Sequence, residues 1–382
     1  MSERSARIAV AIGGALALCL AASAQAQGSG PQWSGYYKNL LLQSDTWSGE
    51  PFTLDLNRLR IELKGELSSA LRFDLQYDNE LLLGNYLRTA QFLQHKDIPP
   101  PQYWRADANY VDTPRLFGTH RLHRATLNVS AGDTDLRIGR QRIAWGTGRF
   151  WSPLDVLNPV SPIALEREER IGVDAVLAEH RFGPLSRLAA VAAPSRSSGR
   201  STVAVQWHAN AGGLDYSLIG GRMLGRRIWG FDLAGQIGQS GIRSEVTHER
   251  PRGGAAYSRV LIGLDHAFAN TLAITAELFF NGSGAPDPAG YDFDALMSGA
   301  VPALGRRYAG VHASYELTPL LKWDGDVVIN LADRSRYLAL GLTYSLRTNL
   351  DLRLGMQRFS GAVGTEYSRP PDAVHAQVQQ FF

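Results

Sequence analysis

Charged residues recur at every second position in several segments of this chain, and arginine supplies most of the positive charge. The sequence holds 39 basic residues, and only Lys38, Lys64, Lys96 and Lys322 among them are lysines. The planar guanidinium of arginine donates paired hydrogen bonds to carboxylate and phosphate groups, which the lysine ammonium does not do. The composition therefore favours contact with anionic or polar groups.

Motifs for catalysis or metal binding are absent from the sequence. It has no Gly-x-Ser-x-Gly motif, no His-Glu-x-x-His motif and no Cys/His metal spacing. His120 and His123 are three residues apart, which on a strand places them on opposite faces. The aspartates around Gly290 do not follow the EF-hand spacing. The sequence therefore predicts no enzyme, no cofactor and no metal site.

The N-terminus has the order of a secretory signal peptide. Arg4 and Arg7 precede an apolar run over residues 8–22, and Ala24-Gln25-Ala26 follows with the small residues of a cleavage site. The run of 15 residues is shorter than the about 20 residues of a membrane-spanning helix. We expect cleavage near Ala26, which also removes Cys19, the only cysteine.

Apolar and charged residues alternate over segments of roughly ten residues. Leu59, Ile61 and Leu63, for example, alternate with Arg60, Glu62 and Lys64. In a transmembrane barrel, one such set faces lipid and the other faces the lumen. A soluble sheet with one wet face has the same local pattern, so the number of strands along the chain must separate the two.

The alternating segments form eight hairpins with short connections. They cover residues 53–79, 121–145, 171–193, 201–222, 227–248, 258–280, 308–332 and 336–358. Their turns contain Ser68-Ser69, Gly132-Asp133, Gly183-Pro184, Gly212-Gly213, Ser240-Gly241, Asn270, Thr318-Pro319 and Thr348-Asn349. One further strand precedes them at 33–43 and one follows at 373–382. We therefore predict an all-β fold, a closed antiparallel transmembrane β-barrel of 18 strands, with 16 as the alternative.

The connections between hairpins are mostly longer and rich in Pro and Gly. The longest span residues 80–120, 146–170 and 281–307, and we expect them to be extracellular loops of a single barrel formed by residues 27–382. Short turns at one rim and long loops at the other are typical of bacterial outer-membrane barrels. The sheet must close, because an open edge in hydrocarbon leaves backbone groups unpaired.

The polar set of each strand is predicted to line the lumen. These pore-lining residues are Arg60, Glu62, Lys64, Arg72, Asp74, Arg124, Arg137, Gln141, Arg243, Glu245, Arg347 and Arg353. Both signs of charge occur, so the list by itself fixes no preference for anions or cations. The arginine excess favours anionic or polar organic solutes.

The most distinctive stretch runs from Gly139 to Pro159 and joins Gly-Arg-Gln to a following Trp-Gly and Asn-Pro. It resembles the third-loop region of porin-like outer-membrane barrels, including alginate-export-like and related uncharacterised families. Ser152-Pro153 also reads as the start of a short helical turn. The resemblance implies that the loop folds inward and narrows the pore. The constriction candidates are then Arg149, Asp155, Glu166, Arg167 and Arg170.

The last strand ends in Phe382, with Val374, Ala376 and Val378 on the same face. A terminal Phe on an alternating strand resembles the signal that bacterial barrel-assembly machinery recognises, although Gln380 departs from that pattern. The expected surroundings are therefore outer-membrane lipid and lipopolysaccharide. The net charge of +3 gives no reason to expect nucleic-acid binding.

These observations predict an outer-membrane porin for passive or facilitated passage of small polar or anionic solutes. Two alternatives stay open: an export conduit for a secreted polymer, and a surface scaffold or binding barrel whose lumen is plugged. Barrels of 16–18 strands are wide enough for an aqueous channel.

Overall fold

The computed structural model describes residues 30–382 apart from 160, 168–169 and 298–300. The predicted signal peptide, residues 1–26, lies outside the described residues. The helical segments are η2 (Asn85–Arg88), α2 (Ala90–His95), η3 (Pro288–Gly290), α3 (Phe293–Met297) and η4 (Glu366–Ser368). None of the helices in the described part of the chain is long and apolar enough to cross a membrane.

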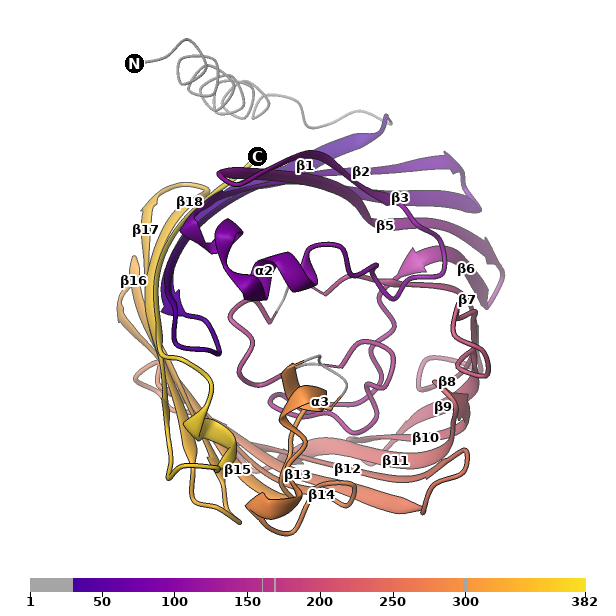
Figure 1. The fold of residues 1–382 in the computed structure, drawn as a ribbon. Helices are drawn as coiled ribbons and strands as arrows, with labels where there is room; N and C mark the ends of the chain where they lie inside the picture. Colours follow the sequence, from indigo (N-terminus) through magenta and orange to yellow (C-terminus); the bar gives the residue numbers. More distant parts are fainter. Residues whose placement is uncertain (1–29, 160, 168–169, 298–300) are drawn as a thin grey trace.

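The strands form one antiparallel sheet that closes on itself (Figure 1). The strands are β1 (Gln32–Asp45), β2 (Pro51–Ser68), β3 (Leu71–Gly84), β4 (Asp107–Thr113), β5 (Leu116–Ala131), β6 (Thr134–Gln141), β7 (Val173–Arg181), β8 (Ser186–Ala193), β9 (Thr202–Ala211), β10 (Leu214–Met223), β11 (Arg226–Ile237), β12 (Ser240–Pro251), β13 (Tyr257–Ala267), β14 (Ala273–Asn281), β15 (Arg307–Thr318), β16 (Leu321–Asn330), β17 (Arg336–Arg347), β18 (Leu350–Ser360) and β19 (Ala373–Phe381). Pairing of β1 with β19, from Tyr36 opposite Phe381 to Ser44 opposite Ala373, completes the ring.

Eighteen of these strands form the barrel wall, as the sequence predicted. The nineteenth, β4, is short and, among the described residues, pairs only with the first part of β5. The second part of β5 pairs with β6 along the same edge. The strand β4 therefore extends the wall above β6 without adding a member to the ring.

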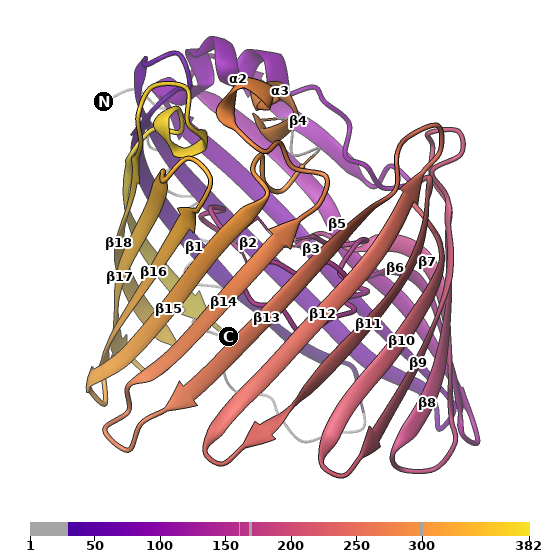
Figure 2. The same ribbon diagram turned by 90° about the horizontal axis from the view of Figure 1, so that it is seen from below.

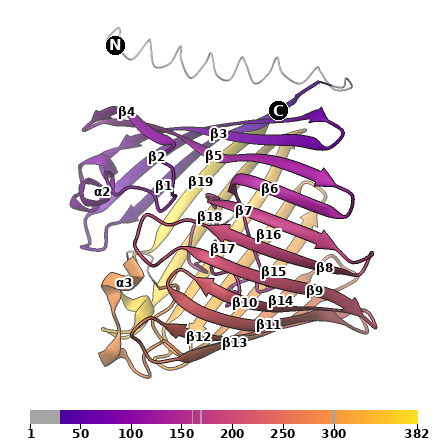
Figure 3. The same cartoon turned by 90° about the vertical axis from the view of Figure 1, so that its right-hand side faces the viewer.

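Each predicted hairpin is present, and the side views show how their ends are arranged (Figures 2 and 3). The short turns gather at one rim, and the long connections with α2, β4 and α3 gather at the other. One predicted turn was wrong: the chain reverses at Gly238, not at Ser240-Gly241, because Ile237 pairs with Ser240. Gly238 has φ +62°, a left-handed backbone conformation that a tight turn needs and glycine adopts without steric cost.

The first long connection places helix α2 inside the mouth of the barrel (Figure 1). Leu87 and Phe92 pack against Phe117 of β5, and all three side chains are buried. Leu82 of β3 and Tyr86 pack against the same cluster. Part of the inner wall near this rim is therefore apolar and covered by the chain itself.

The seam between the first and last strands is tightly packed around a glycine. The amide of Gly35 donates to the carbonyl of Phe382 at 3.0 Å, and the amide of Phe382 donates back at 3.1 Å. A Cβ at Gly35 would lie 2.2 Å from the carbonyl oxygen of Arg60 and 2.9 Å from the Phe382 ring. A side chain at this position therefore cannot be accommodated without moving the backbone of β1 or β2.

We expect Gly35→Val to reduce the folded fraction of the barrel, because overpacking costs about 1–3 kcal/mol and acts here at the closing seam. The measurement is the heat-modifiable mobility of the refolded protein on a gel. Gly220→Val in β10 is the matched control, since no atom lies within 4 Å of a Cβ there. Equal folded fractions for the two variants would show that the seam tolerates a side chain.

Candidate functional site

The described part of the connection between β6 and β7, residues 142–172 apart from 160 and 168–169, lies inside the ring of strands (Figure 1). We call it the internal loop. It leaves the wall near Gly146, whose φ of +102° and lack of a Cβ allow the sharp exit. A Cβ there would lie 2.3 Å from the Ser152 hydroxyl and 2.8 Å from the Glu245 carboxylate. The glycine is therefore required by close approach as well as by backbone conformation.

Glu245 on β12 holds the first part of the loop. Its carboxylate accepts hydrogen bonds from the backbone amides of Thr147 at 2.5 Å, Gly148 at 2.6 Å and Leu154 at 3.1 Å. The Ser152 hydroxyl donates to the same carboxylate at 2.9 Å. A buried carboxylate is stable only when donors replace its water, and four donors from the loop do so here.

Glu277 on β14 repeats this arrangement. It accepts from the backbone amides of Arg149 at 2.7 Å and Phe150 at 2.8 Å. Arg243 on β12 donates to the carbonyl oxygen of Thr147 at 3.1 Å. Phe150 and the neighbouring Trp151 are almost fully buried, and the Trp151 ring stacks on Phe279 at 5.3 Å.

The predicted helical turn after Ser152 is not formed as a helix. The chain makes a single turn in which the amide of Asp155 donates to the Ser152 hydroxyl and carbonyl, each at 3.2 Å. The amide of Leu154, which a helix would leave free at its first turn, is bound instead to Glu245. Tertiary hydrogen bonds to the wall therefore replace the helix.

The loop also buries an apolar surface against β7–β11. Its contribution comes from Ile143, Trp145, Leu154, Val156 and Leu157. The wall contributes Ala175, Leu177, Ala189, Val191, Ala193, Ala204, Ile219, Met223 and Ile228. The inner face of β7–β11 is thus apolar where the loop covers it, and charged inner positions lie on β1–β6 and on β12–β18.

The last part of the loop crosses to the opposite wall. Arg167 donates to Asp326 on β16 at 2.9 Å, and Gln357 on β18 donates to the carbonyl of Ile163 at 3.3 Å. Asp155, which is buried, pairs with Arg170 at 2.9 Å within the loop. Burial raises the pKa of the Asp155 carboxyl to about 7, although Arg170 and the Asn158 amide favour its charged form.

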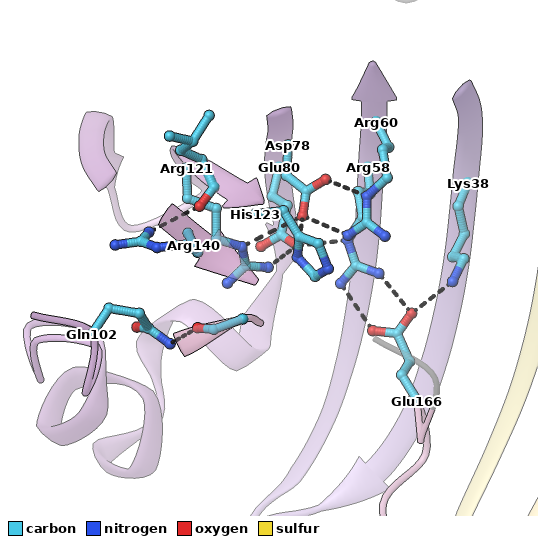
Figure 4. A network of polar contacts seen from close by, with 12 residues as sticks. Lys38, Arg58, Arg60, Asp78, Glu80, Gln102, Arg121, His123, Arg140 and Glu166 are labelled. Carbon is cyan, nitrogen blue, oxygen red and sulfur yellow. Dashed lines mark hydrogen bonds and ion pairs between the residues drawn. The ribbon is translucent and has the colours of Figure 1, made fainter. Parts of the chain in front are cut away.

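Glu166 joins the loop to β1 and β2 (Figure 4). Its carboxylate accepts from the Lys38 ammonium at 2.9 Å and from both terminal nitrogens of Arg58 at 2.9 and 3.0 Å. Burial opposes ionisation of Glu166, but the charges and hydrogen bonds of Arg58 and Lys38 outweigh it and lower its pKa. This bridge connects the loop to the wall at β1 and β2.

A row of ion pairs continues from this bridge along β2, β3 and β5 (Figure 4). Arg60 binds Asp78 through two hydrogen bonds of 2.6 and 2.8 Å, and Nδ1 of His123 lies 3.4 Å from the same carboxylate. Glu80 accepts from Arg58 at 2.6 Å and from Arg121. Opposite charges on neighbouring strands thus fix the positions of the guanidinium groups.

A second group of arginines lies beside these pairs. The Arg124 guanidinium is within electrostatic range of Arg60 and Arg142 and also of the carboxylates of Asp74 and Glu62. Arg142 acts in turn on Asp155 and Arg170. Within the described residues, Nε of Arg124 is buried without a hydrogen-bond partner, while Arg142 is exposed. Several positive charges therefore converge where the internal loop meets the charged wall.

Toward the short-turn rim the lumen widens into a cavity of about 700 Å³. Its charged lining residues carry both signs and come from β2, β3, β6 and β7. They are Lys64, Glu66, Arg72, Asp74, Asp135, Arg137 and Glu179. Four of the predicted pore-lining residues therefore lie together on the short-turn side of the internal loop: Lys64, Arg72, Asp74 and Arg137.

The remaining predicted residues are distributed around the wall. Arg60 is ion-paired, Arg243 and Glu245 hold the internal loop, and Arg353 pairs with Asp324 at 2.7 Å. Glu62 lies within hydrogen-bond distance of Lys64 at 3.2 Å, and Arg347 is exposed at the short-turn end of β17. Gln141 is buried and donates to the Ala175 carbonyl at 3.0 Å, so it joins β6 to β7.

The list of predicted residues omitted several that the structure brings to the same place. They are Lys38, Arg58, Glu80, Arg121 and His123. Arg58 has the same parity as Arg60 on β2, so the alternation already indicated it. The inward position of both His123 and Arg124 depends on an irregularity in the pairing of β3 with β5, between Gln76 and Tyr77. Neither residue spacing nor composition reveals that irregularity.

No known family and no curated protein matches this sequence. Solved structures do resemble its fold. The outer membrane protein OpdK from Pseudomonas aeruginosa is 12% identical, with a TM-score of 0.55, over 92% of this chain and 98% of that one. OccAB4 from Acinetobacter baumannii is 8% identical, with a TM-score of 0.57, over 93% of this chain and 99% of that one.

A second structure of Pseudomonas aeruginosa OpdK contains vanillate. It is 11% identical to this chain, with a TM-score of 0.53, over 92% of this chain and 98% of that one. At these identities the likeness concerns the fold. The chain thus has the fold of porin-like outer-membrane β-barrels, and no particular family among them is assigned.

Replacing Glu245 and Glu277 together by alanine should release the internal loop, because six donors of the loop lose their acceptors. We expect larger and noisier single-channel currents in a planar bilayer, since the released loop no longer occupies a fixed position in the lumen. Glu50→Ala, in the exposed β1–β2 connection, is the control. Unchanged conductance in the double variant would mean that apolar packing alone holds the loop.

The Glu166 bridge gives a pH prediction. The pKa of Glu166 in the folded protein lies below the ordinary pKa of a glutamate. The carboxylate therefore stays charged, and the bridge intact, at any pH above that ordinary pKa, and the bridge is lost only when the pH falls through the lowered pKa. Ion selectivity that depends on Glu166 should therefore stay constant from about pH 7 to about pH 5. Reversal potentials across a salt gradient measure this. A transition within that range that Glu166→Gln abolishes would contradict it.

Proposed function

We propose that this chain, after removal of its signal peptide, is an outer-membrane channel for small polar solutes that favours anionic ones. The proposal begins with the membrane. A closed sheet leaves no unpaired edge in hydrocarbon, which is the requirement for a strand protein to span a bilayer. Large apolar side chains lie exposed on the outer face, as lipid contact requires; Ile262, Leu278 and Leu354, for example, are 59%, 57% and 50% exposed.

The observation that carries the anion preference is that Arg124, whose Nε has no hydrogen-bond partner among the described residues, lies near Arg60 and the exposed Arg142 beside the internal loop, with Asp74 and Glu62 as the nearby carboxylates. Clustered guanidinium groups repel one another, and an anion between them lowers that repulsion. A guanidinium also offers paired donors that match a carboxylate. We therefore place the preferred path for organic anions along the wall of β2, β5 and β6, between the loop and the charged row.

The presence of vanillate in a structure of OpdK is consistent with this proposal. Vanillate is a small aromatic carboxylate, and OpdK has the same fold as this chain at 11% identity. We extend only the chemical class to this chain, namely small organic acids. The mixed charges of the wider cavity below the loop would orient such solutes without binding them tightly.

The purified protein alone should conduct ions in a planar bilayer, with a reversal potential that shows preference for the anion. Arg142→Gln combined with Arg124→Gln should reduce the anion-to-cation permeability ratio about twofold or more, since two charges leave a narrow part of the path. Arg252→Gln, which removes the same charge from the exposed β12–β13 connection, should leave the ratio unchanged.

Entry of small carboxylates into proteoliposomes supplies the second measurement. Vanillate and benzoate should enter faster than a neutral sugar of similar size, and the double arginine variant should reduce that difference. A barrel that conducts only after residues 85–115 are deleted would support the plugged scaffold instead. Conduction that requires a periplasmic partner would support the export conduit.

A further inference from the structure

Three exposed arginines lie next to one another at the long-connection rim, on β10, β11 and β12. Arg222 is directly opposite Arg227, and Arg227 is directly opposite Arg250. We call these three residues the outer arginine row. Directly opposite residues of antiparallel strands have their Cβ atoms about 4.5–5.5 Å apart, and like charges at that separation destabilise a sheet. The row therefore has a cost that the fold does not explain.

The outward direction of the row follows from the residue next to each arginine. Met223 on β10 and Ile228 on β11 pack against the internal loop and therefore point inward. Glu249 on β12 is opposite Ile228 in the strand register, so it shares the inner face. Successive residues of a strand point to opposite faces, which directs all three arginines of the row outward.

The row lies just beyond the part of the wall that a membrane would cover. Toward the short turns from Arg227, the outward positions of β11 are Trp229, Phe231, Leu233, Gly235 and Ile237. Residues 229–237 have the length of a membrane-spanning strand, which is about 9–11 residues. Trp229 is 61% exposed, as expected of an aromatic residue at the membrane interface. The row is therefore at the level of the lipid headgroups.

The protein supplies no anion to the row. None of the three guanidinium groups has a carboxylate partner in the part of the chain that the structure describes. Glu249 is the only acidic residue in the surrounding segments 194–207, 216–231 and 246–258. Its buried carboxylate is bound on the inner face by Arg226 and Arg259. The positive charge at this sector of the outer rim is therefore not balanced locally.

Other directly opposite basic residues in this barrel have carboxylates of their own. Two such pairs occur in the strand pairings of the described residues. Lys38 and Arg58 share the carboxylate of Glu166. Arg181 and Arg187 lie 3.0 and 3.8 Å from carboxylates on neighbouring strands. By comparison with these pairs, the outer arginine row lacks an anion that must come from outside the chain.

We propose that the outer arginine row binds the phosphate groups of lipopolysaccharide in the outer leaflet. The inference rests on the membrane insertion and orientation contained in the proposed function, and it does not depend on conduction. Lipopolysaccharide carries its phosphates on the sugars next to its acyl chains, which is the level at which Trp229 places the row. A guanidinium donates paired hydrogen bonds to phosphate oxygens, and a phosphate between facing guanidinium groups offsets their repulsion.

The surroundings of the row favour a phosphorylated lipid over other anions. Val203 on β9 is directly opposite Arg222, and its side chain is 64% exposed. Leu218, further from the rim on β10, is 50% exposed. A ligand that covers this surface must carry an anionic group and apolar chains in one molecule. Lipopolysaccharide has both, whereas inorganic phosphate and an acidic polypeptide lack the acyl chains.

Binding of purified lipid A to the full chain in neutral detergent tests the proposal, and native mass spectrometry counts the bound lipid. The wild-type protein should bind diphosphorylated lipid A more tightly than the dephosphorylated lipid. Substitution of Arg222→Gln, Arg227→Gln and Arg250→Gln together should weaken binding of the diphosphorylated form about tenfold or more, because each basic residue at the headgroup level adds to the attraction. We call this combination the row variant.

The matched control removes the same charge from the same rim on the other side of the barrel. It combines Arg307→Gln, Arg334→Gln and Arg336→Gln, at exposed positions that are not directly opposite a basic residue in the described pairings. This control should bind lipid A as the wild type does. In lipid-free detergent, heat-modifiable mobility should show that the row variant is at least as stable as the wild type, because it no longer contains the like charges.

A second measurement detects the ligand in intact outer membranes. A photoreactive benzophenone amino acid at Val203, directly opposite Arg222, should form an adduct that contains lipopolysaccharide and no second polypeptide. The row variant should lose most of this adduct. The same photoreactive group at Phe280, opposite Arg307 on the other side of the barrel, is the control. Its adducts should be unchanged by the row variant.

Three results would overturn the proposal. They are equal affinity of the wild type and the row variant for lipid A, displacement of lipid A by inorganic phosphate but not by chloride of the same ionic strength, and an adduct at Val203 that contains another polypeptide. Conductance of the row variant in a planar bilayer should equal that of the wild type. If the chain fails to insert at all, the heat-modifiable band would be missing from every variant, and the proposed function fails with it.

Discussion

Backbone pairing without a free edge is the constraint on which the rest of this structure depends. Each wall strand pairs on both sides, and the pairing of β1 with β19 removes the last edge. Once the sheet is closed, alternate side chains must point either inward or outward. Adjacent residues of one strand consequently lie in different surroundings. Lys38 binds the internal loop, while its neighbour Asn39 lies on the outer face.

The closed barrel encloses a wide interior, and the internal loop occupies part of it (Figure 1). The wall holds that loop by apolar packing and by hydrogen bonds from two carboxylates, and both are required to fix its position. Apolar residues of β7–β11 bury its hydrophobic side chains, but packing alone does not orient a backbone. Glu245 and Glu277 provide the direction, since carboxylates accept several amide bonds only from a loop in one position. The residues beside the loop, including Arg142, are thereby held at a defined place.

Most of the fold could be predicted from the sequence because a period of two is a local property. The strand pattern and turn residues located each hairpin, and only the Ser240-Gly241 turn was displaced. Less of the candidate site could be predicted from the sequence. Contacts such as Thr147 with Glu245 join residues almost a hundred positions apart, and they depend on the stagger of the closed sheet. The single-residue irregularity opposite Gln76 and Tyr77 turns both His123 and Arg124 inward, and alternation alone assigns them to opposite faces.

Loss of a carboxylate has different consequences on the inner and outer faces of β1–β3. On the inside, Arg58 and Arg60 are held by Glu80, Glu166 and Asp78, so removing one carboxylate changes the local field in an aqueous lumen, where water limits the cost. On the outside, Asp55 accepts hydrogen bonds from the amides of Asn39 and Asn57 and pairs with no basic side chain among the described residues. The same type of substitution, acid to apolar, should therefore alter selectivity on the inner face.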